Sequence, residues 1–509
     1  MMRSLSRFAL ATVTVVSACL VVELATRMID GYRVWSTHLV RVRPGVAPPS
    51  DAGKWMDPQQ AVEYVARIPV AEGISRDWYT LDPDKPPPRP IDPELERRYW
   101  TARDHELPSV YEWNLEFVRR VICEGDRSEY PYLASQFRRL TDAFVFEPAD
   151  RQPYPTYRFL RNVRYPSGLT TNSFGWRGPE VALNKPAGRI RIAFVGASTT
   201  LDAHGDPFSY PEYVGRWLQV WATTRYPSVS VDVINAGREG VLSNSIAAIV
   251  RQEVLPLHPD LVVYYEGANQ FWPNDFVARP LERVLRVLGG GSSLVEHSAI
   301  AARIGNAVAR PQSGSEPYKP SMAVSWPSDL DEHDPPLTDR RLPLQLPRIL
   351  NDLEVIRRST GNIGGTLIVS SFVWLVSPGL VLDPNRDAVI HQELNQRYWP
   401  FSYAHMRRYV DFENRVFETY AHAHDLPFND AARVFPMDPR LFVDSIHMTP
   451  AGVKLKAWLV FQNLVPVLDK GIRAGTFPVV DRGERRVHPA FAGPDRHLVP
   501  IDRVASDCR

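Results

Sequence analysis

The stretch IRIAFVGAST at residues 190–199 decides the fold. It begins with alternating apolar and polar residues, becomes continuously apolar, and stops at Gly196. This pattern is typical of a strand that is buried on both faces of a parallel sheet. We therefore predict a strand over 190–195 that leads into a turn carrying Ser198.

Strands and helices alternate along the chain downstream of this stretch. We predict further strands at 229–234, 260–265, 366–371 and 426–429, separated by helices at 211–221, 244–255, 346–358, 405–422 and 451–468. Such alternation requires crossover connections, and hence a parallel sheet covered by helices. The predicted fold class is α/β, with three layers in the order helix, sheet, helix.

Length and composition limit the possible classes of protein. The chain has 509 residues, more than one ordinary domain of roughly 100–200 residues. Its 59 basic and 58 acidic residues leave a net charge of +1, which argues against a dedicated nucleic-acid binder. The three cysteines match no metal-binding spacing and form no disulfide framework, and a Cys123–Cys508 bridge is only a guess.

The sequence divides into four parts. These are an anchor or signal sequence at 1–28, a Pro- and aromatic-rich stalk or cap of unknown fold at 29–165, the α/β domain at 166–470, and a tail at 471–509. The stalk or cap contains candidate helices at 58–68 and 133–144. The α/β domain carries an insertion at about 276–339, whose position suggests a lid.

The N-terminus has the features of an export signal. An uncharged apolar run at 8–22 follows Arg3 and Arg7. Extended to residue 26, the run would span about 28 Å as a helix, close to the roughly 30 Å of a bilayer core. We expect an uncleaved single-span anchor, while a cleaved signal peptide and a lipoprotein signal ending at Cys19 stay open. All three place the rest of the chain outside the cytoplasmic membrane.

The residues directly after the strands carry the candidate chemistry, because ligands bind at the carboxyl edge of an open parallel sheet. Ser198 lies at a strand-to-helix turn, which exposes its hydroxyl. A serine hydroxyl needs a base to take its proton, and His447 is the candidate. Asp444, three residues earlier, would accept the Nδ1 proton of His447 and leave Nε2 facing Ser198. The pattern predicts a Ser-His-Asp set that attacks an acyl carbonyl.

An oxyanion that forms in this reaction must be met by N–H groups. The candidates are the backbone N–H of Ser198, the backbone N–H of Gly240 and the side-chain amide of Asn269. Glycine allows the close approach and the unusual dihedral angles that such a donor needs. Gly237 is an alternative to Gly240 and is otherwise a tight-turn glycine.

Two other features near these strand ends have competing interpretations. One group of aromatic residues would either stack on sugar rings or pack in the core: Tyr264, Tyr265, Phe271 and Trp272. Glu266 and Asp275 would suit a glycosidase carboxylate pair. The ester-cleaving set already explains this neighbourhood, so we give the glycosidase interpretation little weight.

The blocks at 196–200, 235–240, 266–269 and 443–452, in this order, resemble those of the SGNH hydrolases, the GDSL-like esterase and lipase superfamily. The resemblance spans roughly residues 188–468. The upstream NSFGWRG stretch at 172–178 is similar to the lead-in of membrane-anchored bacterial members.

Carried over residue by residue, the family's functional positions fall on Ser198, Gly240, Asn269, Asp444 and His447. The last block is the most specific, because its Asp-x-x-His is closely followed by Thr-Pro-Ala-Gly. Two positions depart from the family pattern, namely Ala197 and Gln270, where aspartates are usual. Neither position holds the nucleophile or an oxyanion donor.

The resemblance implies an extracytoplasmic serine esterase with a flavodoxin-like sheet, anchored by a single pass in a bacterial membrane and needing no metal or organic cofactor. Its substrate would be an O-acyl ester on envelope or exported polysaccharide, or a lipid ester. Two alternatives stay open. One is a polysaccharide O-acetyltransferase that uses the same residues, and the other is a non-catalytic binding or assembly protein with this fold.

Overall fold

The computed structural model describes residues 2–29, 34–35, 55–84, 147–148, 157–158, 170–202, 208–238, 240–271, 298–308, 324–383, 386–398 and 401–480. The predicted helix at 133–144, the suggested Cys123–Cys508 bridge and most of the insertion at 276–339 lie outside these residues. Cys19 is a free, exposed cysteine.

A five-stranded parallel sheet forms the centre of the α/β domain. Its strands are β3 (Arg189–Gly196), β4 (Ser230–Asn235), β5 (Leu261–Tyr265), β6 (Thr366–Ser370) and β7 (Phe428–Asn429), in the order β4-β3-β5-β6-β7. The predicted parallel sheet is therefore confirmed. The strand order reverses direction between β3 and β5, and in doubly wound sheets this switch point is where ligands bind.

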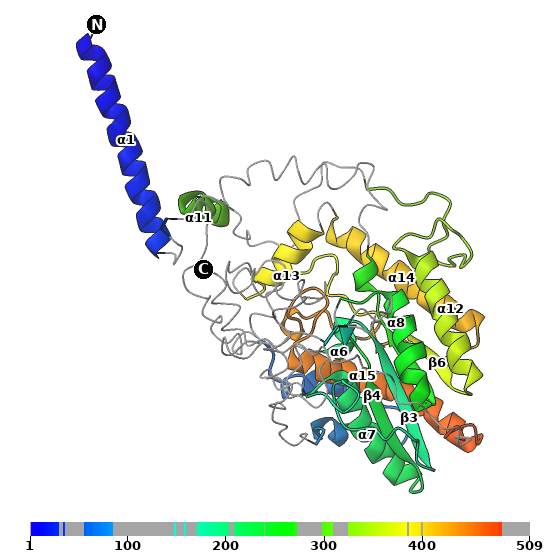
Figure 1. Cartoon of the computed structure of the whole chain (residues 1–509). Helices are drawn as coiled ribbons and strands as arrows, with labels where there is room; N and C mark the ends of the chain where they lie inside the picture. The colour runs from blue at the N-terminus through cyan, green and yellow to red at the C-terminus, as the bar shows by residue number, and fades with distance from the viewer. Residues whose placement is uncertain are drawn as a thin grey trace.

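Helices cover both faces of the sheet. They are α7 (Tyr210–Arg225) and α15 (Pro450–Arg473) on one side, and α8 (Ser243–Ile249), α12 (Leu346–Asn362) and α14 (Tyr403–Ala423) on the other (Figure 1). A capping box between Ser209 and Glu212 starts α7. Predicted helix 244–255 is shorter than expected, because residues 250–254 form a π-helical turn ahead of Pro256, which has no N–H for a regular helix.

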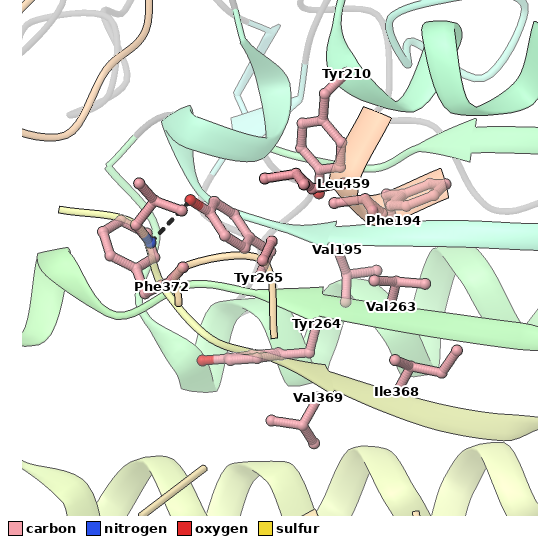
Figure 2. Packing of buried hydrophobic residues seen from close by; sticks show 14 of the residues in the cluster. Phe194, Val195, Tyr210, Val263, Tyr264, Tyr265, Ile368, Val369, Phe372 and Leu459 are labelled. Carbon is pink, nitrogen blue, oxygen red and sulfur yellow. Dashed lines mark hydrogen bonds between the residues drawn. The ribbon is translucent and has the colours of Figure 1, made fainter. Parts of the chain in front are cut away.

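Two consecutive tyrosines of β5 show how the two helical layers meet the sheet. Tyr264 and Tyr265 point to opposite faces (Figure 2), as neighbouring strand residues do. Tyr264 packs edge-on against Phe417 of α14, whereas Tyr265 packs against Tyr210 of α7 and stacks on Phe372. Both tyrosines are fully buried. Of the two interpretations left open for them, core packing is the correct one.

Residues 55–84, from the stretch predicted as a stalk or cap, pack on the α7 and α15 layer. They include α2 (Val62–Arg67) and the 3₁₀ turn η2 (Arg76–Thr80). The indole nitrogen of Trp217 donates to the Leu81 carbonyl at 3.0 Å. The Tyr79 ring stacks on Trp217 and meets Trp458 edge-on. This part of the stalk or cap is therefore built into the outside of the α/β domain.

Helix α1 (Met2–Ile29) contains the apolar run, and it extends away from the α/β domain with α11 (Ala299–Val308) beside its C-terminal end (Figure 1). The Glu23 carboxylate accepts the Ala299 N–H at 2.7 Å and the Ser298 hydroxyl at 2.8 Å. Arg27 also donates to the Glu23 carboxylate at 2.8 Å. Across the described ranges, no helix has both the length and the apolarity that crossing a membrane requires.

Candidate active site

Ser198 is the first residue of the short helix α6 (Ser198–Leu201), which follows β3 at the switch point of the sheet. A Cβ atom on Gly196 would clash with the Tyr265 carbonyl oxygen and with the Thr200 side chain, so only glycine allows this turn to lie so close to β5. The Thr200 hydroxyl donates to that carbonyl at 3.0 Å. The turn therefore holds Ser198 at the carboxyl edge of the sheet, where it was predicted.

The structure brings the three predicted reactive side chains together, although 249 positions separate Ser198 from His447. Nε2 of His447 is 2.7 Å from Ser198 Oγ, and its Nδ1 is 2.7 Å from Asp444 Oδ2. All three side chains are buried. An ionised Asp444 can only accept, so Nδ1 carries the ring proton and Nε2 is free to accept the Ser198 hydroxyl proton.

The environment of Asp444 keeps this carboxyl in its charged form. Burial would raise its pKa, but the charge of His447 and the N–H groups of His447 and Ile446 outweigh burial and hold the pKa below its usual range. The backbone N–H groups of Ile446 and His447 donate to Asp444 Oδ1 at 2.9 and 2.7 Å. One oxygen therefore fixes the loop while the other orients the imidazole.

Hydrogen bonds and close packing with distant segments fix the loop that carries Asp444 and His447. The Ser445 N–H donates to Glu393 at 2.8 Å, and the Ser445 carbonyl accepts the Leu375 N–H at 2.7 Å. A Cβ atom on Gly452 would clash with the Leu441 carbonyl, so this glycine lets α15 begin against the loop. The close approach gives a physical reason for the glycine of Thr-Pro-Ala-Gly.

Besides the Ser198 N–H after β3, the candidate oxyanion donors lie on the turns that follow β4 and β5. Nδ2 of Asn269 donates one of its two hydrogens to the Val241 carbonyl at 2.9 Å. Gly240 has a φ of 67°, in the left-handed region that favours glycine. The Gly237 N–H donates to the Asn235 side chain at 3.1 Å, and a Cβ atom there would clash with Leu201. Gly237 therefore serves close packing against α6, which favours Gly240 as the donor.

Helix α6 is too short to satisfy its own last carbonyl groups, and three buried side chains do so instead. Lys456 Nζ donates to the Thr199 carbonyl at 2.7 Å. Asn235 Nδ2 donates to the Thr200 carbonyl at 3.0 Å, and Arg177 donates to the Leu201 carbonyl at 3.2 Å. Arg177 belongs to the NSFGWRG stretch at 172–178. This stretch therefore fixes the C-terminal end of α6, the helix that begins with Ser198.

Lys456 and Asp202 form a buried ion pair at the end of this helix. Lys456 Nζ is 3.0 Å from Asp202 Oδ1 and 4.1 Å from the centre of the Tyr210 ring. Burial lowers the pKa of Lys456, and the charge of Asp202 opposes that effect. Sequence reasoning missed both residues. The available signal was the position of Lys456 directly before the apolar run AWLVF at 457–461, within α15.

Both departures from the family pattern have structural explanations. Ala197 is fully buried between β3 and α6. Gln270 accepts the Ser243 N–H at 2.9 Å, at the first residue of α8, and so joins the Asn269 turn to that helix. In the described part of the chain, no group of three or more His, Cys, Asp or Glu side chains is arranged to hold a metal ion.

Comparisons with known proteins returned matches among solved structures at low sequence identity. No protein-family model matches the chain, and no curated protein matches its sequence. An acetylxylan esterase from Geobacillus stearothermophilus is 15% identical, with 56% of this chain and 96% of that chain covered and a TM-score of 0.31. An alpha/beta hydrolase enzyme from the metagenome of Lake Arreo, Spain, is also 15% identical, with 55% and 96% covered and a TM-score of 0.29.

Proposed function

We propose that this chain is a serine hydrolase of the SGNH type that cleaves carboxylic O-acyl esters. The observation that carries the proposal is the continuous contact from Ser198 through His447 to Asp444, with both hydrogen-bond distances at 2.7 Å. This arrangement supplies a nucleophile, a base of the correct tautomer and a carboxylate that stabilises the imidazolium.

The reaction follows from the positions of these groups. Ser198 Oγ attacks the ester carbonyl while His447 Nε2 accepts its proton. The N–H groups of Ser198 and Gly240 and the Asn269 amide meet the oxyanion. The imidazolium then gives its proton to the leaving alkoxide, and an acyl-serine remains. Water attacks this ester with His447 again as base, which releases the carboxylic acid and restores Ser198.

A fluorophosphonate probe tests the proposal directly. We expect one equivalent to react with the folded full-length chain and peptide mapping to place it on Ser198, because an unactivated serine does not react at a useful rate. The exposed Ser228 serves as the internal control and should stay unlabelled. The same preparation should release free acetate from p-nitrophenyl acetate, with water as the acceptor. A folded chain that neither labels nor hydrolyses would support a non-catalytic role.

We further propose that the catalytic domain lies outside the cytoplasmic membrane and acts on envelope or exported polysaccharide, or on lipid. The support is the uncharged run at 8–22 behind two arginines.

Protease treatment of bacterial spheroplasts tests this location. The domain of the full chain should be degraded from outside, whereas a variant lacking residues 2–28 should be protected in the cytoplasm together with a cytoplasmic marker protein. Protection of the full chain would contradict the proposed location.

A further inference from the structure

Two buried carboxyl groups lie beside the candidate active site, and the reaction above uses neither of them. Glu266 directly follows β5 and is 2% exposed, while Glu413 of α14 is 1% exposed. A Cβ atom on Gly267 would come within 3.0 Å of both Glu413 carboxylate oxygens. Glycine at this position therefore lets the Glu413 carboxyl lie against the turn that begins with Glu266. Acidic side chains are seldom buried without a specific partner, so the pair calls for an explanation.

Glu266 interacts with both halves of the candidate site. Its Oε1 accepts the Asn269 N–H at 2.8 Å, on the turn that carries the oxyanion amide. The backbone N–H of Ala197, one residue before Ser198, also interacts with this carboxyl. One carboxylate therefore links the nucleophile turn after β3 to the oxyanion turn after β5. Glu413 has no such link, and its Oε2 lacks a hydrogen-bond partner among the described residues.

Glu266 and Glu413 differ in the pH at which their carboxyl groups ionise. Burial raises the pKa of Glu266 to about 7, although the N–H groups of Asn269, Gly267 and Ala197 and the charge of His447 lower it. Burial and the charge of Glu266 raise the pKa of Glu413 to about 8. Glu266 is therefore the first of the pair to become charged as the pH rises.

Other titratable groups around Glu266 are the two tyrosines at the end of β5. Burial, with a contribution from the charge of Glu266, keeps the pKa of Tyr264 and of Tyr265 well above the ordinary value. Both tyrosines stay neutral through the range in which Glu266 titrates. His447 is thus the cation that an ionised Glu266 faces once the imidazole takes up the serine proton.

We propose that Glu266 is a positioning residue for the proposed hydrolysis, and the inference rests on that function. Its carboxylate accepts the Ala197 and Asn269 N–H groups and so fixes the two turns relative to each other. Ser198 and the Asn269 side-chain amide can then both contact the carbonyl group of the bound ester. Misplacing either group by a fraction of an ångström reduces turnover, because attack and charge stabilisation need the correct geometry together.

The test is the kinetics of Glu266→Gln in the full-length chain, with p-nitrophenyl acetate as substrate. The oxygen of glutamine has two lone pairs and its NH₂ group only donates, so glutamine cannot serve the N–H groups of Ala197, Gly267 and Asn269 together. At pH 8 we expect kcat to fall about 10- to 100-fold, less than or equal to the loss of about 10²- to 10³-fold expected for Asn269→Ala. KM should change less than about threefold, because binding of the small ester does not depend on this alignment.

A pH series separates positioning from simple damage to the core. The ratio of the wild-type kcat to that of Glu266→Gln should rise between pH 6 and pH 8.5, because wild-type Glu266 becomes a full acceptor only as it ionises near pH 7. Glu413→Gln is the matched control, since it changes the neighbouring buried carboxyl and leaves the carboxylate that accepts the Ala197 and Asn269 N–H groups in place, and its kcat should stay within about threefold of wild type.

Stability provides the second readout. The pKa of Glu266 is raised from 4.5, so the folded state loses stability as the pH rises from about 4.5 to about 7, and a neutral glutamine avoids this loss. Glu266→Gln should therefore lose activity at pH 8 without lowering the unfolding temperature. An unchanged kcat, a ratio independent of pH, or an equal loss in Glu413→Gln would each overturn the inference while wild type remains active. A wild-type chain that neither hydrolyses nor labels would instead overturn the proposed function, and this inference with it.

Discussion

Replacing Asp444 with asparagine should lower kcat for ester hydrolysis by about 10⁴-fold. Asparagine is nearly the same size and can keep an oxygen where Oδ1 accepts the Ile446 and His447 N–H groups. Its NH₂ group would then face His447 Nδ1 in place of Oδ2. A donor at this position forces the ring proton onto Nε2, and that nitrogen can no longer accept the Ser198 proton.

Steady-state kinetics with p-nitrophenyl acetate measure this effect, and Ser198→Ala gives the background rate. Circular dichroism and the unfolding temperature should show that Asp444→Asn still folds, because the loop contacts of Oδ1, Ser445 and Gly452 remain. A kcat within about tenfold of wild type would mean that the carboxylate does not set the tautomer, and would remove the basis for assigning Asp444 its role.

The sheet could be predicted because its sequence signals are local and redundant. Predicted strand 190–195 is observed as Arg189–Gly196, and predicted strand 366–371 as Thr366–Ser370. Each of these two strands is an apolar run that ends at glycine or a small polar residue. A continuous apolar run is the sequence pattern expected of a strand that is buried on both faces. The candidate site was predictable for a related reason, since in a parallel sheet every strand carries its following turn to the same edge.

The supporting residues could not be predicted, because their roles depend on contacts between distant segments. Arg177 and Lys456 reach the same four-residue helix from positions on either side of it in the sequence. No periodicity marks a side chain that satisfies another element's carbonyl group. Glu266 was visible only as a possible glycosidase carboxylate, since its link to Ala197 exists only once β3 and β5 lie side by side.

Replacing Lys456 with methionine should have the largest effect on stability, a loss of about 3–5 kcal/mol. Methionine has a similar length and no charge, so Asp202 would be left as a buried carboxylate without its lysine partner. The Thr199 carbonyl would also lose its donor, next to the nucleophile. Urea unfolding of the full-length chain, followed by tryptophan fluorescence, should show a lower midpoint than wild type, and kcat should fall as well.

A double variant separates the unpaired charge from lost packing. Asp202→Asn removes the charge and keeps an oxygen that can accept the Tyr210 N–H, which Asp202 now accepts at 2.9 Å. Because breaking a buried pair costs more than replacing both partners, Asp202→Asn with Lys456→Met should recover more than half of the lost stability. Activity should recover less, since neither substitution returns a donor to the Thr199 carbonyl. If the double variant were as unstable as Lys456→Met alone, the loss would come from the missing donor to the Thr199 carbonyl and from the contacts of Lys456 Nζ with the Tyr210 and Tyr265 rings, and the ion pair would contribute little.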